Sequence, residues 1–167
     1  MLVLLQKSGL DRAMSQIGNV RLALAAGAVG SAMWVLDYLR EQLNAPHRSG
    51  SPLASKESVQ LRHADMQISV FAARSMLYRV ARMVTASGVD ENKAEVAAVK
   101  IFATETAGRV VDEAIQLVGG NALIVGHPLE ALYRKVRSMR LTEGANDLLR
   151  MQLSQHATGA RQPPARL

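Results

Sequence analysis

Apolar residues recur along most of this chain at intervals of three and four, and short polar stretches that contain glycine or proline interrupt them. This spacing gathers apolar side chains on one face of an α-helix. It predicts a first helix over residues 11–43 and a second that begins at Pro52, with Ser51 as its N-cap, and stops at Gly88. A third helix is expected to begin behind Asp90 and to end at Gly119-Gly120.

Two shorter helices are expected in the remaining chain, one from Pro128 to about Arg140 and one from a cap at Thr142 to about Gln155. No strand-like alternation competes with them, so the pattern predicts an all-α protein, an antiparallel four-helix bundle. We expect residues 1–157 to form a single domain and residues 158–167 to be a disordered tail. The expected core stripes are Val59, Met66, Val70, Ala73, Leu77, Val80 and Val84 in the second helix, and Val96, Val99, Ala103, Ala107, Val110, Ala114 and Leu117 in the third.

Composition narrows the class of protein. The 167 residues are 49% hydrophobic, which suits one domain with a real core, and the absence of cysteine excludes disulfides and thiol nucleophiles. The apolar run of residues 22–36 is bounded by Arg21 and Asp37 and is shorter than the roughly 20 residues of a membrane-spanning helix. We therefore expect a cytoplasmic protein without a membrane partner.

Charge and histidine content suggest little chemistry by themselves. The formal net charge is +6, and residues 134–167 carry seven Lys and Arg against Glu143 and Asp147. Such a basic region suits a phosphate-bearing ligand, whereas nucleic-acid binding would rest on charge alone and is not expected. The four histidines are scattered without the spacing of metal ligands, so no metal site is expected.

Two stretches stand out as candidates for function. Residues 116–121, Gln-Leu-Val-Gly-Gly-Asn, end a predicted helix with two glycines, and in isolation they indicate only a helix stop. Glu143-Gly144 places one carboxylate at the start of a predicted helix, where a Glu normally complements the helix dipole on the surface.

Read in order, these stretches resemble the C-terminal helical domain of the acyl-CoA dehydrogenases. The similarity runs from about Ala13 to Gln155 and rests on an ordered set of short motifs rather than on any single one. The set consists of Arg21 with the Ala25–Gly30 run, Gly50-Ser51-Pro52-Leu53, Lys100, Gln116 with Gly119-Gly120, His127-Pro128-Leu129-Glu130, Tyr133-Arg134 with Arg137, and Glu143-Gly144.

The resemblance implies FAD as cofactor and acyl-CoA as substrate. In this family a Glu removes the α-proton of the acyl-CoA thioester while the β-hydride passes to FAD, and Glu143 occupies the position of that base. Gln116, Gly119 and Gly120 would bind the flavin nucleotide, commonly that of a neighbouring subunit. Arg48 and Gly50 lie in the segment of a second flavin-binding motif. Arg21 and Gly144 would lie on the substrate side.

Enzymes of the family also carry an N-terminal helical domain and a middle β-domain, to which nothing here corresponds. The resemblance therefore implies the C-terminal domain or subunit of a flavin-dependent acyl-CoA dehydrogenase, an enzyme of α,β-desaturation, and this chain alone would be incompetent. Partners would be further copies of the chain, as a dimer or tetramer, or a partner dehydrogenase chain. The alternative is a non-catalytic helical assembly subunit of a heteromeric dehydrogenase.

Overall fold

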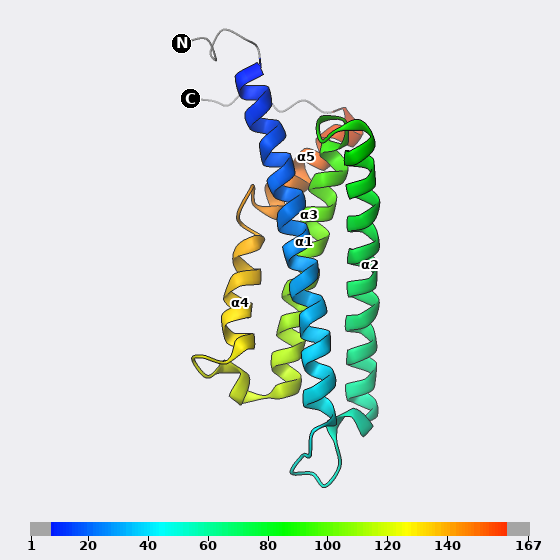
Figure 1. Ribbon diagram of the computed structural model, residues 1–167, viewed down its shortest axis with the longest axis vertical. Coiled ribbons are helices and arrows are strands. Elements are labelled where there is room, and N and C mark those ends of the chain that lie inside the picture. Colours follow the sequence, from blue (N-terminus) through cyan, green and yellow to red (C-terminus); the bar gives the residue numbers. More distant parts are fainter. Residues whose placement is uncertain (1–7, 160–167) are drawn as a thin grey trace.

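The computed structural model describes residues 8–159 and contains five α-helices in that range: α1 (Ser8–Asn44), α2 (Glu57–Ser87), α3 (Lys93–Val118), α4 (Pro128–Met139) and α5 (Asn146–Thr158). Short 3-10 turns, η1 (Leu53–Ser55), η2 (Asp90–Asn92) and η3 (Gly120–Leu123), lie in the connections. The helices α1, α2 and α3 run side by side and alternate in direction (Figure 1). The shorter α4 and α5 follow each other along one side of this group, so the predicted all-α bundle is confirmed.

The core lies around α3, which contacts each of the other four α-helices. Its buried residues include Val99, Val110 and Val111, and α1 faces them with Ala25, Ala28 and Ala32. Because alanine side chains are short, the two helix backbones can approach closely. The predicted stripes of α2 and α3 are buried at every position except Leu77, Val84 and Leu117, which are partly buried against the same core.

The helix α1 is both long and apolar. Within the described residues it is the single helix long and apolar enough to cross a membrane by length and composition, over Gln16–Asn44, and 33% of its most apolar window is buried in the bundle. A core helix of a bundle meets the same criteria. Here its buried alanines pack against α3.

Two predicted helix starts are wrong. The second helix begins at Glu57 and not at Pro52, because Pro52 has an extended backbone and the chain then makes the separate turn η1. Ser51 is therefore no N-cap. The third helix begins at Lys93, because Asp90 is the first residue of the turn η2 and makes no side-chain capping bond.

The predicted start of the last helix is also wrong, and the difference lies in the turn that contains Glu143 and Gly144. Thr142 does not cap α5, which begins at Asn146 behind Ala145. Residues 140–145 instead form a turn that the hydrogen bond from the Asn146 N–H to the Arg140 carbonyl closes at 3.0 Å. At the far end, α5 includes Thr158, and residues 160–167 of the predicted tail lie outside the described residues.

Candidate functional site

The turn between α4 and α5 has an unusual backbone at Glu143 and Gly144. Glu143 has φ of 56° and is the single non-glycine residue with positive φ in the described chain, and Gly144 follows with φ of 95°. A left-handed conformation at a residue with a side chain costs about 1–2 kcal/mol. Contacts from elsewhere in the bundle must therefore hold this turn.

The first of these contacts comes from α1. The Nε of Arg21 donates a hydrogen bond of 2.8 Å to the carbonyl oxygen of Glu143. A Cβ added to Gly144 would lie 3.2 Å from Nη2 of Arg21, so the glycine allows the guanidinium to lie against the turn. Burial lowers the pKa of Arg21, and the negative charge of Glu143 opposes that shift.

The second contact comes from a buried lysine of α3. Lys100 is 0% exposed, and its Nζ donates to the carbonyl oxygen of Gly144 at 2.9 Å and to Oδ1 of Asn146 at 2.8 Å. Burial lowers the pKa of Lys100 to about 8, and the charge of Arg21 acts in the same direction. The carboxylates of Glu143 and Glu105 oppose the shift.

Further polar groups orient Asn146, the first residue of α5. Its Nδ2 donates to Oγ1 of Thr104 at 3.1 Å and to Oε1 of Glu105 at 3.2 Å. The other oxygen of Glu105 accepts a 2.7 Å bond from Nη2 of Arg150. These bonds, with Arg150 the strongest cause, lower the pKa of Glu105. The turn is thus connected to α3 by a continuous polar network.

The Glu143 side chain itself is only half-buried, and within the described residues no hydrogen bond or ion pair engages its carboxylate. The positive charges of Arg21 and Lys100 act on it through space. A carboxylate on a firmly held backbone, without a protein partner for its oxygens, is chemically suited to accept a proton from a bound molecule.

A cleft adjoins Arg21 on the side of the bundle where α1, α3 and α5 meet. Its volume is about 380 Å³, and its walls include Arg21, Gly18, Val96 and Leu153. Gly18 is required there, because a Cβ at this position would lie 2.5 Å from Cγ2 of Val89. Arg21 thus touches both the Glu143 turn and a cleft large enough for part of a small molecule.

The residues expected to bind flavin lie at the other end of the bundle. Gln116, Gly119 and Gly120 are exposed where α3 ends, and Arg48 and Gly50 are exposed in the loop that follows α1. Both loops lie at the lower end in Figure 1. Added Cβ atoms at Gly119 and Gly120 would meet no described atom within 4 Å, so another molecule can approach this backbone.

The structure therefore brings Arg21, Glu143 and Gly144 together, and it separates them from Arg48 and Gly50. Arg21 and the end of α1 are about 35 Å apart along the helix axis. Across residues 8–159, no group of three or more His, Asp or Glu side chains is arranged to hold a metal ion.

Lys100, Glu105, Asn146 and Arg150 belong to the site but were not among its predicted residues. A signal for Lys100 was present, since it lies beside Val99 and Val96 on the apolar stripe of α3, where a lysine needs a buried partner. The sequence spacing of Glu105, Asn146 and Arg150 does not predict their contacts, because the hydrogen bonds join residues of two separate helices, α3 and α5.

Comparison with known proteins identifies similar chains. A family profile described as "Acyl-CoA dehydrogenase, C-terminal domain" matches residues 7–158. The mitochondrial short-chain specific acyl-CoA dehydrogenase of Rattus norvegicus is 29% identical over 152 residues, which is 89% of this chain and 35% of that protein. The (R)-benzylsuccinyl-CoA dehydrogenase of Thauera aromatica is 35% identical over 140 residues, 84% of this chain and 34% of that protein.

The fold is found in solved structures as well. An acyl-CoA dehydrogenase from Bacillus anthracis, complexed with FAD, superimposes with a TM-score of 0.81 at 26% identity, over 91% of this chain and 30% of that one. The present chain thus spans about a third of the length of the relatives it matches.

Proposed function

This chain belongs to the acyl-CoA dehydrogenase family, whose C-terminal domain it matches over residues 7–158, and from this premise we propose that it serves as the C-terminal part of a flavin-dependent acyl-CoA dehydrogenase. The reaction would be α,β-desaturation of an acyl-CoA thioester. The observation that carries the proposal is the strained turn at Glu143, which Arg21 and Lys100 hold from two different helices.

Glu143 is proposed as the base that removes the α-proton. Such a proton is weakly acidic, so the carboxylate needs a fixed position and a site from which water is excluded. The hydrogen bonds to the carbonyls of Glu143 and Gly144 provide the fixed position. They leave both carboxylate oxygens available to substrate, and Arg21 extends the site toward the adjoining cleft.

The donor groups at the lower end of the bundle fit a flavin nucleotide. Gly119 and Gly120 leave space beside the backbone, Gln116 can donate and accept hydrogen bonds, and the Arg48 guanidinium suits a pyrophosphate. FAD, when bound, would accept the β-hydride. Because this end is far from Glu143, we propose that these residues serve the flavin site of a neighbouring subunit.

This chain by itself is proposed to be inactive. Glu143 is only partly buried within the described residues, and about two-thirds of the length of the relatives has no counterpart in the matched region. Water in contact with the carboxylate would weaken it as a base. The remaining parts of the enzyme, from the same or another chain, would have to close the site.

The decisive experiment replaces Glu143 in the assembled enzyme. The complex that forms around this chain in its native cells is purified through a tag on the chain, and the reduction of an artificial electron acceptor is followed with a panel of saturated acyl-CoA thioesters. We expect Glu143→Gln to lower turnover about a thousandfold while the complex keeps its flavin absorbance. Glu41→Gln changes the same charge at an exposed position of α1 and is expected to leave turnover unchanged.

The alternative function, a non-catalytic assembly subunit, is favoured by one feature of α2. Leu61, Ile68, Phe71 and Tyr78 are 62%, 65%, 73% and 52% exposed, and their spacing puts them along one side of the helix. Exposed apolar residues in such a row are typical of contacts with another chain, so they also support association with further copies or a partner dehydrogenase. Unchanged turnover in Glu143→Gln would rule out the catalytic role and leave this one.

A further inference from the structure

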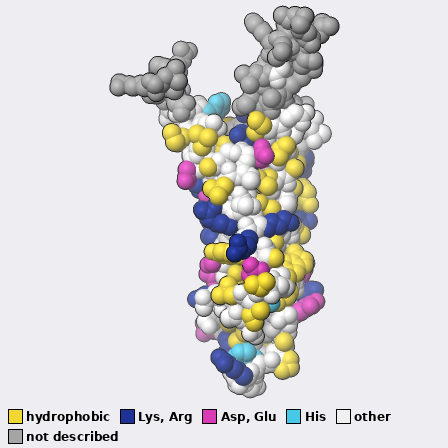
Figure 2. Space-filling model, turned by 90° about the vertical axis from the view of Figure 1, so that its left-hand side faces the viewer, with side chains coloured by type: hydrophobic (Ala, Val, Ile, Leu, Met, Phe, Trp, Pro, Cys, Tyr) yellow, Lys and Arg dark blue, Asp and Glu magenta, His cyan; other side chains and the backbone are white. Residues whose placement is uncertain are grey.

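A second site is suggested by a basic groove between α3 and α4, away from the Glu143 turn. The groove has a volume of about 300 Å³. Its walls include Gly108, Arg109 and Asp112 from α3, Tyr133 and Arg137 from α4, and Arg140 directly behind α4. In Figure 2, which faces the side of the molecule where α4 lies, Lys and Arg side chains gather at mid-height. None of the residues assigned above to acyl-CoA or flavin lines this groove.

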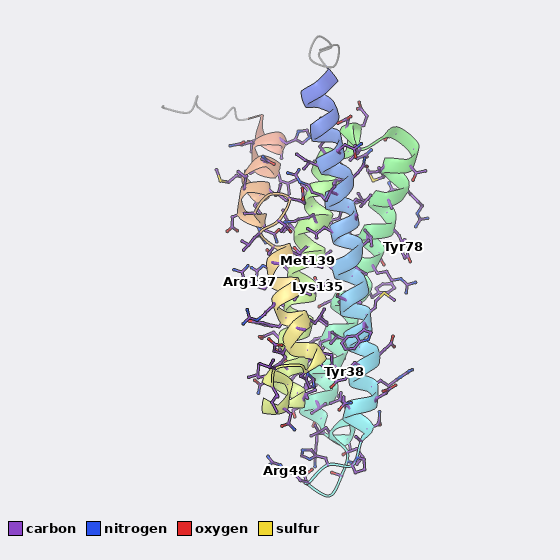
Figure 3. The ribbon with its side chains drawn as sticks, turned by 60° about the vertical axis from the view of Figure 1, so that its left-hand side comes forward. Tyr38, Arg48, Tyr78, Lys135, Arg137 and Met139 are labelled. Atoms are coloured by element: carbon purple, nitrogen blue, oxygen red, sulfur yellow. The ribbon has the colours of Figure 1, made fainter. Side chains whose placement is uncertain are left out.

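The positive charges in this groove are not neutralised by neighbouring side chains. Across residues 8–159, Arg137 takes part in no hydrogen bond or ion pair of its side chain, and Figure 3 labels it on the side of α4 that points away from α1 and α2. Arg109 donates only to the neutral Oγ1 of Thr106, at 3.3 Å. The one carboxylate of the lining, Asp112, forms no ion pair within the same range.

Arg140, at the upper end of the groove, has a carboxylate within electrostatic reach, but that carboxylate is already engaged. Its charge acts on Glu105, whose oxygens accept hydrogen bonds from Arg150 at 2.7 Å and from Asn146 at 3.2 Å. The lining thus contains three arginines and one carboxylate, an excess of two positive charges. That excess matches a doubly charged anion.

Gly108 provides an independent indication that a ligand approaches here. A glycine in a helix interior is less favourable than an alanine, and Gly108 lies well inside α3. A Cβ at this position would meet no described atom within 4 Å, so packing inside the bundle does not require the glycine. Because Gly108 has no side chain, the groove stays open between Arg109 and the arginines at the C-terminal end of α4.

We propose that this groove binds a phosphate group, either as a free inorganic anion or as part of a small organic phosphate. Guanidinium groups are planar and form paired hydrogen bonds with phosphate oxygens, which suits Arg109 on α3 and Arg137 and Arg140 at the C-terminal end of α4. The ring of Tyr133, at the rim of the groove and 42% exposed, is placed to contact the organic part of such a ligand. The site is independent of the proposed dehydrogenase function.

The test is calorimetric titration of the full chain with inorganic pyrophosphate, at an ionic strength held constant with sodium chloride. We expect saturable binding at one site per chain, which Arg137→Gln weakens about tenfold. Arg79→Gln is the matched control, because Arg79 is exposed on α2 and the change in net charge is identical. Its affinity is expected to stay within twofold of the parent chain. Circular dichroism confirms that each variant is folded.

A second variant tests the groove without any change in charge. Gly108→Leu fills the space between the helices and is expected to weaken pyrophosphate binding at least as much as Arg137→Gln does. Equal weakening by Arg137→Gln and Arg79→Gln, unchanged binding in Gly108→Leu, or the absence of saturation would each overturn the proposal.

A titration with a second ligand, ADP, distinguishes an organic phosphate from a free inorganic anion. If the ligand is an organic phosphate, Tyr133→Ala weakens binding of ADP more than binding of pyrophosphate, because only ADP has a base that can stack on the ring. If the ligand is the free anion, both affinities respond alike. This comparison identifies the kind of phosphate ligand. Whether the groove binds phosphate at all is decided by the Arg137→Gln and Gly108→Leu variants.

Discussion

Two glycine-containing turns of this molecule, Glu143-Gly144 and Gly119-Gly120, are built in opposite ways. Side chains from α1 and α3 hold the first, through Arg21 and Lys100. The second relies on local backbone bonds, such as that from the Gly119 N–H to the Ile115 carbonyl at 2.8 Å, and its glycines face open space. The contrast indicates that contacts from two other helices fix the backbone at Glu143, whereas the glycines of the second turn have no such contacts within the described residues.

The largest expected change in the free energy of unfolding comes from a substitution that breaks the polar network behind the Glu143 turn. Asn146→Ala removes the acceptor of the buried Lys100 ammonium and the donor to Thr104, so we expect a loss of about 3 kcal/mol in the free energy of unfolding. Asn121→Ala, in the exposed glycine loop, is the matched control and is expected to change it by less than about 0.5 kcal/mol. Urea unfolding measures both, and similar values would contradict the contrast between the two turns.

The glycines themselves offer the next comparison. Gly144→Ala introduces a Cβ at φ of 95° and 3.2 Å from the Arg21 guanidinium, whereas Gly119→Ala has φ of 86° and no described neighbour within 4 Å. We expect a loss of about 2 kcal/mol for Gly144→Ala and about 1 kcal/mol for Gly119→Ala in thermal or urea unfolding. Equal losses would show that backbone strain alone, and not the contact with Arg21, sets the requirement for glycine.

The dependence of stability on pH tests the burial of Lys100. The folded chain releases the lysine proton near its pKa of about 8, whereas the unfolded chain keeps it up to the ordinary value of 10.5. Between these values the unfolded state binds more protons, so the free energy of unfolding rises with pH, by about 1 kcal/mol per pH unit. The rise should vanish in Lys100→Met, and its persistence there would assign it to another group.

The smallest expected changes in stability concern the exposed residues at the lower end of the bundle in Figure 1. Arg48→Ala and Gln116→Ala remove side chains that lie on the surface, so each is expected to change the free energy of unfolding by less than about 0.5 kcal/mol. In the assembled enzyme the same changes are expected to lower the flavin absorbance per chain after gel filtration. A large loss of stability with unchanged flavin content would mean that these residues serve the fold and not the cofactor.

Sequence reasoning worked best where the signal was local and periodic. The stripes of α2 and α3 and the range of α4, from Pro128 to Met139, follow from spacing and from a proline suited to the first turn of a helix. It failed at Ser51, Asp90 and Thr142, because residues typical of N-caps also occur in the tight turns that precede helices. It also missed Lys100, Glu105, Asn146 and Arg150, because their contacts cross from α3 to α5 and to the turn before it.

The sequence by itself determined the helical class, the buried stripes and, through an ordered set of motifs, the family to which the chain belongs. Only the tertiary structure decided that Lys100 reaches the Gly144 carbonyl, that Glu143 adopts a left-handed backbone and that three arginines from α3 and from the C-terminal end of α4 line one groove. The physical reason is range. Periodicity and propensity act between residues a few positions apart, whereas these features require side chains 28 to 122 positions apart to be brought together by the packing of helices.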